Sequence, residues 1–214
     1  MKKLLRLLAV QMFAAVLAVA AVAGPAGADT TETDAEIAAQ WQNAWNTYKF
    51  YDTTPPAPGS GRSRVTTSIS IQIDAPIMHV FAAYSNINNH IGRAAFLKRV
   101  ITHKDWCAGG TRYINLTAIE DIPYEGAVVS LKTFAQQRIH SDDYYYETDT
   151  WSEPNVVTHQ KIVFKRVPGN KTVVTENLTF DADATLIDFV VQNGVASHQQ
   201  TQTAIKQAIE SGQL

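Results

Sequence analysis

The chain has 214 residues, of which 45% are hydrophobic and 18% are charged, a composition typical of one globular domain with a sizeable core. Its 18 basic and 20 acidic residues give a net charge of -2, which argues against nucleic acid or an anionic membrane surface as a partner. Cys107 is the only cysteine, so an internal disulfide is excluded.

The first 28 residues have the organisation of a bacterial-type signal peptide. Lys2, Lys3 and Arg6 form a basic start, an uncharged apolar run follows from residue 7 to 22, and small residues offer a cleavage site near Ala28. Cleavage leaves 15 of the 18 basic residues against 20 acidic ones. We therefore expect a secreted, acidic mature chain with no stable membrane anchor; a membrane-anchoring helix is the alternative for this segment.

Residues 29–61 are expected to form an amphipathic helix and a linker. The pattern predicts the helix from Thr33 to Tyr51, and the proline- and glycine-rich sequence 55–61 fits neither a helix nor a central strand. The helix either packs on the body of the domain or docks a partner protein through its bulky face, which carries Ile37, Trp41, Trp45 and Tyr48. The linker marks the boundary of a ligand-binding domain at residues 62–214.

Strand-like sequence fills the middle of the chain. Val65, Thr67, Ile69, Ile71 and Ile73 alternate with more polar residues, which predicts a strand with one buried face, and Pro76 begins a short helix. Six further strand-like runs follow, at residues 96–103, 111–120, 126–134, 138–151, 156–167 and 171–180. The turns between them are predicted at 109–110, 121–123, 135–137, 152–155 and 168–170. Short connections between successive strands indicate antiparallel neighbours.

A long amphipathic helix is predicted at the end of the chain, from a cap at Asp183 to Gly212. One face repeats at three- and four-residue steps and carries Ile187, Val190, Val191, Gly194, Val195, His198, Thr201, Ile205, Ala208 and Ile209. This face needs a sheet to lie on. Because a twisted sheet does not touch a helix along its whole length, we expect a cavity between them.

Three short motifs carry a resemblance to a known superfamily. They are IQIDAP at residues 71–76 with Val80-Phe81 after it, GGTR at 109–112, and GNKTVVT at 169–175. Together with the order of the elements, they resemble the START-like (SRPBCC) superfamily of polyketide cyclases and aromatases, lipid-transfer START domains and Bet v 1-type proteins. The resemblance covers residues 64–211. Many relatives have a tryptophan after the first helix, where this chain has Asn88-Asn89-His90-Ile91, so we expect a different pocket rim.

The resemblance implies an α+β helix-grip fold. In this fold a curved, seven-stranded antiparallel sheet surrounds the long C-terminal helix, and a cavity between the two holds an apolar ligand. The N-terminal helix and the signal peptide are additions to this plan.

Residues on the third strand-like run are candidates for ligand contact. Tyr113, Asn115 and Thr117 share one face and offer a phenol, an amide and a hydroxyl, with Tyr113 the best donor for polarising a carbonyl group. Arg112 lies on the other face, whose remaining residues are apolar; the sequence leaves open which face is concave. Within the tyrosine run 144–146, Tyr145 points opposite to its neighbours, so at least one tyrosine is expected to face inward or to pack across strands.

The long helix supplies the other candidates. His198 lies on the apolar face and is either a general acid or base or a buried structural residue. Gly194 either shapes the pocket or lets a strand come close. The full ligand-binding set predicted from the sequence is Tyr113, Asn115, Thr117, Tyr145, Val191, Gly194, Val195 and His198.

The sequence carries no signature of a metal site or a cofactor. Its six histidines are scattered, and no phosphate loop, dinucleotide fingerprint or nucleophile elbow is present. Cys107 is interpreted as a small packed side chain. His159, Lys161 and Glu176 are explained by a solvated face of the sheet.

Three functions remain open from the sequence. The first is a secreted START-like protein that binds a hydrophobic small molecule, such as a lipid or polyketide, without covalent chemistry. The second is a cyclase or aromatase in which Tyr113, His198 and Arg112 position and protonate the substrate. The third places the function in the N-terminal helix, as a docking surface on an exported protein.

Overall fold

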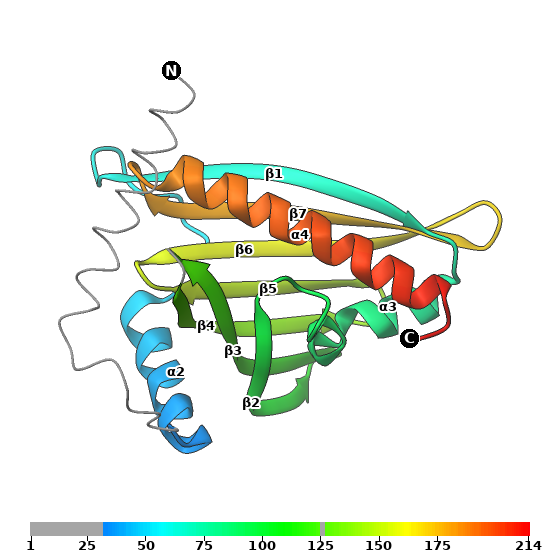
Figure 1. The fold of residues 1–214 in the computed structure, drawn as a ribbon, viewed down its shortest axis with the longest axis horizontal. Coiled ribbons are helices and arrows are strands. Elements are labelled where there is room, and N and C mark those ends of the chain that lie inside the picture. Colours follow the sequence, from blue (N-terminus) through cyan, green and yellow to red (C-terminus); the bar gives the residue numbers. More distant parts are fainter. Residues whose placement is uncertain (1–31, 125–126) are drawn as a thin grey trace. The chain divides into compact units, whose positions relative to one another are not determined.

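A computed structural model describes residues 32–124 and 127–214 (Figure 1). The signal peptide expected at residues 1–28 lies outside the described residues. In chain order, the helices are α2 (Asp34–Tyr48), α3 (Ile77–Ser85), the short 3-10 helix η1 (Ile87–His90) and α4 (Ile187–Glu210). Among the described residues, no helix has both the length and the apolar character needed to cross a membrane.

The predicted seven-stranded antiparallel sheet is confirmed. Its strands are β1 (Arg62–Ile73), β2 (Leu97–Ala108), β3 (Thr111–Tyr124), β4 (Ala127–His140), β5 (Tyr145–Ser152), β6 (Val156–Val167) and β7 (Lys171–Asp183). The spatial order is β1-β7-β6-β5-β4-β3-β2, and every neighbouring pair is antiparallel. With α4 lying against this sheet, the domain has the helix-grip α+β fold (Figure 1).

Two predicted turns were wrong. Residues 135–137 lie inside β4, and the chain reverses instead at residues 141–144, where Tyr144 has a positive φ of 49°. The physical reason is the Ser-Asp-Asp sequence at 141–143, because short polar side chains favour turns. Residues 121–123 likewise continue β3, which ends at Tyr124.

The sheet has two faces, whose residues alternate along each strand. Leu116, Ala135 and Thr150 lie opposite one another on β3, β4 and β5, and all three belong to the face that we call the inner face, which α4 covers. The next row is formed by Thr117, Phe134 and Trp151 and belongs to the outer face. This alternation decides which side chains can meet beneath α4.

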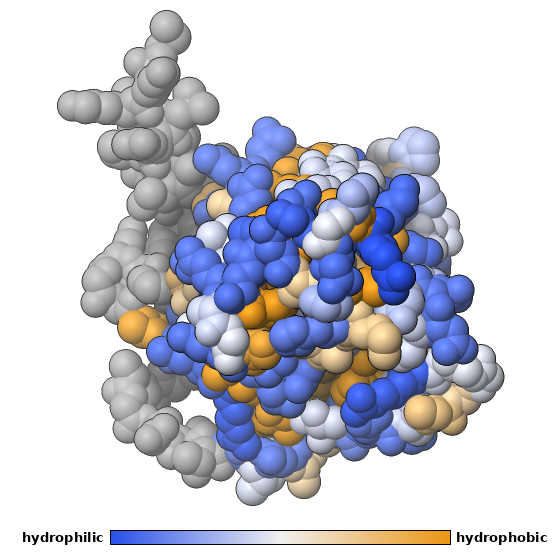
Figure 2. Space-filling view, turned by 90° about the vertical axis from the view of Figure 1, so that its right-hand side faces the viewer, coloured by the Kyte–Doolittle hydropathy of each residue, from blue (hydrophilic) through white to orange (hydrophobic). Residues whose placement is uncertain are grey.

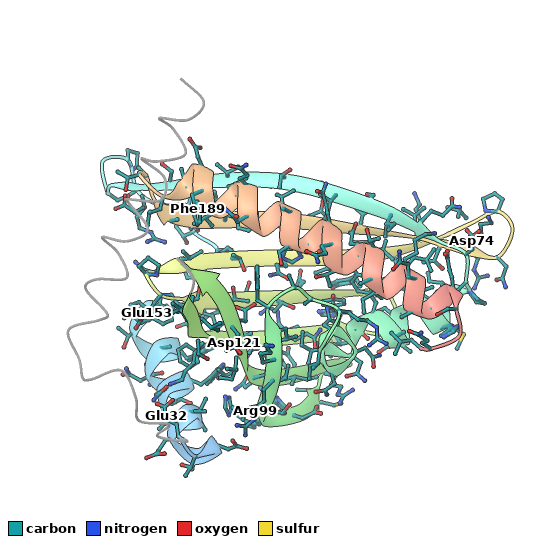
Figure 3. The ribbon with its side chains drawn as sticks, viewed as in Figure 1. Glu32, Asp74, Arg99, Asp121, Glu153 and Phe189 are labelled. Atoms are coloured by element: carbon teal, nitrogen blue, oxygen red, sulfur yellow. The ribbon has the colours of Figure 1, made fainter. Side chains whose placement is uncertain are left out.

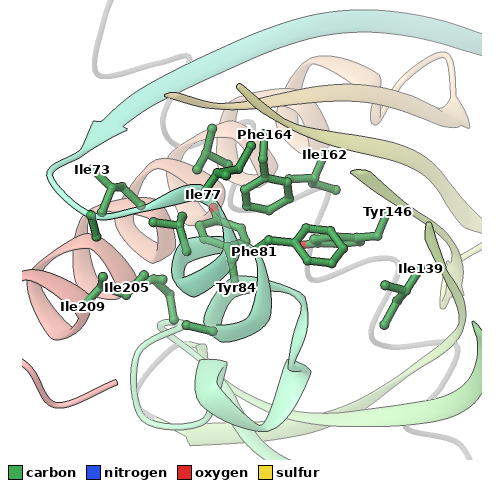
Figure 4. Close-up of a cluster of buried hydrophobic side chains, with 14 of the residues drawn as sticks. Ile73, Ile77, Phe81, Tyr84, Ile139, Tyr146, Ile162, Phe164, Ile205 and Ile209 are labelled. Carbon is green, nitrogen blue, oxygen red and sulfur yellow. The ribbon is translucent and has the colours of Figure 1, made fainter. Parts of the chain in front are cut away.

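The main core lies between the inner face, α3 and the C-terminal half of α4 (Figure 4). Its members include Tyr84 from α3, Phe164 from β6 and Ile205 from α4, each with at most a few per cent of its surface exposed. Phe81 and Tyr84 both pack edge-on against Phe164. Burial of so many large apolar side chains fixes the position of α4 over the sheet.

Figure 3 shows Phe189 near the N-terminal end of α4 and Asp74 near the opposite end of the helix. The two ends are held differently. At the C-terminal end, Glu210 accepts a hydrogen bond from the backbone N–H of Asp74 at 2.7 Å, and Lys206 donates to the carbonyl of Gln72 at 2.7 Å. The N-terminal end begins after Leu186 without a side-chain cap. The predicted cap at Asp183 is wrong, because this residue ends β7 and its carboxylate accepts from the backbone N–H of Thr185 at 2.8 Å.

Helix α2 packs on the outer face of the sheet. The indole of Trp41 donates to the carbonyl of Ala135 at 2.9 Å and belongs to an aromatic cluster with Phe134 and Trp151. Ile37 is also buried. Two of the four residues expected to dock a partner are therefore covered by the sheet in this structure. Of the other two, Trp45 is partly buried in the same cluster, and Tyr48 is 42% exposed and stacks on Trp151.

Polar residues dominate the end of the domain at which α3 and the C-terminus lie (Figure 2). Hydrophobic side chains show there only in small areas between hydrophilic ones. Met78 on α3 is the most exposed of the large hydrophobic residues described, at 68%.

Candidate functional site

A cavity of about 180 Å³ lies between the inner face, α4 and the α3–η1 segment. Small side chains leave the space open, because Ala118 and Ala135 on the sheet and Ser197 on α4 do not reach across it. Polar and ionisable groups line much of the wall, and they are Tyr84, His90, Glu120, Thr133, Gln137, Thr148, Thr150, Gln160, Glu176, His198 and Thr201. The exposed surface of the cavity nevertheless remains mostly apolar, as expected from the sequence, with more polar groups than expected at its wall.

His198 and Glu176 form the central polar contact of this cavity. The carboxylate Oε2 of Glu176 lies 2.6 Å from Nδ1 of His198, and its Oε1 accepts a hydrogen bond from the Tyr84 hydroxyl. Glu176 is only 2% exposed, because it sits on β7 between the fully buried Val174 and Leu178 on the same face. His198 lies on the side of α4 that also presents Thr201 and Ile205 to the sheet.

The pKa of Glu176 is held below its ordinary value. Burial alone raises the pKa, but the hydrogen bond and the charge of His198, with the Tyr84 hydroxyl, outweigh it. Burial and the nearby Glu176 charge raise the pKa of Tyr84 well above its usual value. Glu176 is thus ionised and Tyr84 is neutral at pH 7. A carboxylate can only accept hydrogen bonds, so His198 donates to Glu176 through Nδ1–H. Its other ring nitrogen, Nε2, takes no part in this contact.

Glu120 on β3 is a second acidic group in the cavity wall. Its Oε2 accepts a hydrogen bond from the Thr133 hydroxyl on β4 at 2.8 Å. Burial raises the pKa of Glu120, and the Thr133 hydrogen bond and the charge of His198 only partly offset that effect. Two carboxyl groups of one cavity therefore have pKa values shifted in opposite directions, an arrangement typical of ligand and catalytic sites.

His90 on η1 closes the cavity beside Tyr84. Its Nε2 lies 2.8 Å from the backbone carbonyl of Tyr84, so it donates there, and its ring meets the Tyr84 ring edge-on. Burial lowers its pKa, which keeps the ring neutral. This residue stands in the segment 88–91, so this part of the cavity wall includes a hydrogen-bonded imidazole.

Three predicted ligand residues on β3 lie away from the cavity. All three point to the outer face. There Tyr113 stacks on Trp106 with the ring centres 5.1 Å apart. Asn115 accepts a hydrogen bond from Gln136 at 2.9 Å, and the Thr117 hydroxyl lies 2.8 Å from His103. We expected these residues to meet the ligand beneath α4, and this prediction was wrong. The pairing of β3 with β4 places Leu116, Ala118 and Glu120 on the inner face instead.

Two further candidates are also placed elsewhere. Tyr145 stacks on His140 at 4.2 Å and lies under the ammonium group of Lys161, both on the outer face, whereas Tyr146 is the tyrosine of this run that lines the cavity. Arg112 forms an exposed ion pair with Asp105 at 2.6 Å. Neither Tyr145 nor Arg112 contacts the His198 group.

Arg112 belongs to a second hollow of about 630 Å³, at the end of the inner face beside α3. Met78 and Phe81 from α3 line it, together with Tyr144 from the β4–β5 turn. Ile87 on η1 lines both hollows. The two spaces are therefore neighbours, with this one side chain at their common boundary.

The remaining candidates on α4 serve packing. Val191 and Val195 contact the cluster formed by Leu178, Phe180 and Ala182 on β7. A Cβ atom on Gly194 would lie 2.7 Å from the ring of Phe180, so this glycine is required for close approach of the helix to the strand. Of the two roles left open for Gly194, the structure favours the close approach. Within the predicted set, His198 is the residue that reaches the cavity.

Sequence reasoning missed both glutamates of the cavity. Glu176 was assigned to a solvated face, and that interpretation is wrong, because its neighbours at alternate positions are core residues. The signal was present in the sequence as one acid within the apolar row Val174, Leu178 and Phe180. Lys161 is partly exposed, as expected of a solvated face.

His159 belongs to a separate polar network on the outer face. Its Nδ1 lies 2.8 Å from Asp149, whose other oxygen accepts from Arg138 at 2.6 Å. Asp181 lies 4.0 Å from its Nε2 and is held by Arg64 at 2.7 Å. Asp149 is 2% exposed and Asp181 5% exposed, so the network is buried and not solvated.

Within residues 32–124 and 127–214, no group of three or more histidine, cysteine or acidic side chains has an arrangement that could hold a metal ion. The expectation that Cys107 is packed is wrong, because the residue is exposed on the edge strand β2.

Solved structures with similar folds give context for this site. Ara h 8.0201 matches with a TM-score of 0.54 at 17% identity over 70% of this chain and 99% of its own. The aromatase/cyclase Zhui from Streptomyces sp. R1128 matches with a TM-score of 0.50 at 11% identity over 69% of this chain and 96% of its own. The di-domain ARO/CYC StfQ of the steffimycin biosynthetic pathway matches with a TM-score of 0.52 at 16% identity. This match covers 69% of this chain and 45% of the StfQ chain. No protein-family model and no curated protein matches the sequence.

Proposed function

Because the chain has the helix-grip fold of the START-like (SRPBCC) superfamily, we propose that it binds a small hydrophobic molecule in the cavity between the sheet and α4. The observation that supports this most is the cavity itself, because protein interiors are normally packed without voids of this size. Two solved structures with a similar fold are named as aromatase/cyclases, so this fold also occurs in proteins that act on small molecules.

Unpaired hydrogen-bonding groups support a ligand in this space. Gln137 lines the cavity and donates through Nε2 to the carbonyl of Ser85, while its buried Oε1 has no hydrogen-bond partner among the described residues. Buried polar atoms without partners are rare in native proteins, and a ligand donor would satisfy this one. His198 also lines the cavity, and Nε2 is the ring nitrogen that does not contact Glu176.

Thermal unfolding with a ligand panel tests this proposal. A compound that binds the native state raises the melting temperature with concentration. Ser197→Leu fills the cavity from α4, and Ala196→Leu places the same side chain on the neighbouring exposed position as a control. We expect wild type and Ala196→Leu to respond to the same compounds and Ser197→Leu to lose the response. Equal responses of all three proteins contradict binding in this cavity.

The His198–Glu176 pair supports a second candidate function, an acid–base enzyme acting on the bound molecule. A buried carboxylate that orients an imidazole toward a cavity is the arrangement of a general base. With an enolisable ketone, His198 Nε2 would take the proton next to the carbonyl, and Glu120 would donate its proton to the carbonyl oxygen. In D₂O, NMR should show exchange of the methyl protons of acetophenone that is faster with wild type than with His198→Gln. Equal rates contradict this function.

A further inference from the structure

The size of the inner cavity limits its occupant to about one ring. Its volume of about 180 Å³ compares with the roughly 150 Å³ of a protein cavity known to bind benzene. Pockets for drug-sized molecules usually measure about 300–1,000 Å³. A fused polycycle or a long acyl chain, as expected from the sequence, exceeds this volume and would have to extend past Ile87 into the second hollow.

Two different hydrogen-bonding groups stand at separate sides of this cavity. Glu120 lies on β3 and Glu176 on β7, and β4, β5 and β6 separate these strands in the sheet. Both carboxyl groups nevertheless line the same space, because the sheet curves under α4 (Figure 1). An occupant between them meets Glu120 at one edge and the His198–Glu176 pair at the other.

The group on the β7 side accepts a proton or a hydrogen bond. His198 uses Nδ1–H for Glu176, so Nε2 is the ring nitrogen left for the occupant. The carboxylate behind the ring stabilises an imidazolium, and hydrogen bonds that involve charged groups are the stronger ones. The best partner for Nε2 is therefore an acidic hydroxyl group, such as a phenol.

On the β3 side, the carboxyl group of Glu120 can donate a hydrogen bond in its neutral form. Burial keeps Glu120 protonated beyond the pH range of an ordinary carboxyl group, and Thr133 already donates to one of its oxygens. A neutral carboxylic acid has one O–H to give. The best partner for this O–H is a carbonyl oxygen.

From the volume and the placement of these groups we propose that the inner cavity takes a single-ring molecule with an acidic hydroxyl at one edge and a carbonyl at the other. In this complex the hydroxyl bonds to His198 Nε2 and the carbonyl accepts from Glu120. The inference rests on the proposed function, since it names the ligand class of the same site. The ligand class that it names is hydroxyaryl ketones and aldehydes, in place of lipids and polyketides.

Calorimetric titration with matched probes tests the ligand class. The reference probe is 4-hydroxyacetophenone; acetophenone lacks the hydroxyl and 4-ethylphenol lacks the carbonyl. We expect each of these two to bind about tenfold more weakly than the reference, the typical effect of one lost hydrogen bond to a strong partner. Equal affinity of all three overturns the assignment of the two edges.

Larger probes separate this inference from the proposed function. We expect no measurable binding of 6-hydroxy-2-acetonaphthone or decanoate, because neither fits the cavity. If either of these binds more tightly than 4-hydroxyacetophenone, the single-ring class is wrong while the binding function stands. If no probe of any size binds, both are wrong.

Variants assign each edge to its residue. His198→Phe should bind the reference and acetophenone equally, because the partner of the hydroxyl is gone. Glu120→Leu should bind the reference and 4-ethylphenol equally, whereas Glu120→Gln keeps an N–H donor and should keep the preference. Unchanged preferences in His198→Phe and Glu120→Leu overturn the two roles. Should either variant fail to fold, the wild-type probe series decides alone.

Discussion

The two faces of the sheet each carry a buried histidine–carboxylate pair, and the pairs differ in what surrounds them. On the outer face, Asp149 binds both His159 and Arg138, and Arg64 holds the neighbouring Asp181. On the inner face, Glu176 binds His198 and the Tyr84 hydroxyl, and no arginine or lysine is among the cavity-lining residues of the described chain.

This difference indicates different roles for the same chemistry. The outer network balances its two carboxylates with two arginines and joins β1, β4, β5, β6 and β7, so it serves stability. Asp181 also lines a shallow surface hollow, but His159 does not. The inner pair lies in the wall of a cavity, and His198 Nδ1 is the ring nitrogen that contacts Glu176. The environment of a pair, and not its residue types, decides whether it can act on a ligand.

Asp149→Asn should give the largest change in stability. The amide cannot balance the charge of Arg138, and removal of one partner from a buried ion pair costs about 3 kcal/mol. The free energy of unfolding from urea titration measures the loss, while ligand affinity at the inner cavity should be unchanged. A loss below about 1 kcal/mol, or a fall in affinity, contradicts a purely structural outer network.

Glu176→Gln should cost about 2 kcal/mol at pH 7, because it removes a charged hydrogen-bond acceptor from two buried donors. The folded-state pKa of Glu176 is lowered, so its contribution is present above the ordinary glutamate pKa and is lost as pH falls through the folded value. The difference between wild type and variant should therefore shrink as the pH is lowered from 7 into the acid range. A difference that is independent of pH contradicts an ionised Glu176.

Gly194→Ala should destabilise the inner side of the domain by about 1–2 kcal/mol, the usual cost of overpacking. The new Cβ would lie 2.7 Å from the ring of Phe180, which is itself buried, so the ring or the helix must shift. Phe180→Leu in the same chain should recover part of the loss, as shown by urea unfolding of the single and double variants. If the two losses simply add, the helix is not limited by this contact.

Glu120→Gln should give the smallest change, under about 1 kcal/mol at pH 7. The folded-state pKa of Glu120 is raised, so wild type loses stability as pH rises from the ordinary glutamate pKa through the folded value. The variant has no such carboxyl group, so its free energy of unfolding should rise relative to that of wild type over this pH range. Parallel stability curves for the two proteins between pH 4 and 8 contradict a raised pKa of Glu120.

Local patterns predicted the order of the main elements, and the resemblance to a known superfamily supplied their helix-grip arrangement. The alternation from Val65 to Ile73 and the three- and four-residue steps from Ile187 to Ile209 are properties of short windows, and they predicted β1 and α4. The turn at 141–144 was missed because the tyrosines at 144–146 favour a strand and hid the polar turn residues before them.

The candidate site depends on pairing between distant segments, which local patterns do not contain. On β3 both faces mix polar and apolar residues, so only the register with β4 shows that Glu120, and not Tyr113, lies beneath α4. Glu176 resembled a solvated strand residue because its partner His198 is 22 positions away on a different element. His198 was found because one polar residue on an otherwise apolar helix face is visible in sequence.

NMR of the histidine rings tests the central claim most directly. The ring signals of His198 and His159 are assigned from single glutamine variants, and 4-hydroxyacetophenone is then titrated into the wild-type protein. The inner cavity account predicts a saturable shift of the His198 signal with no change at His159. A shift at His159, or at the indole signal of Trp41, with none at His198 would place the ligand on the outer face and contradict the account.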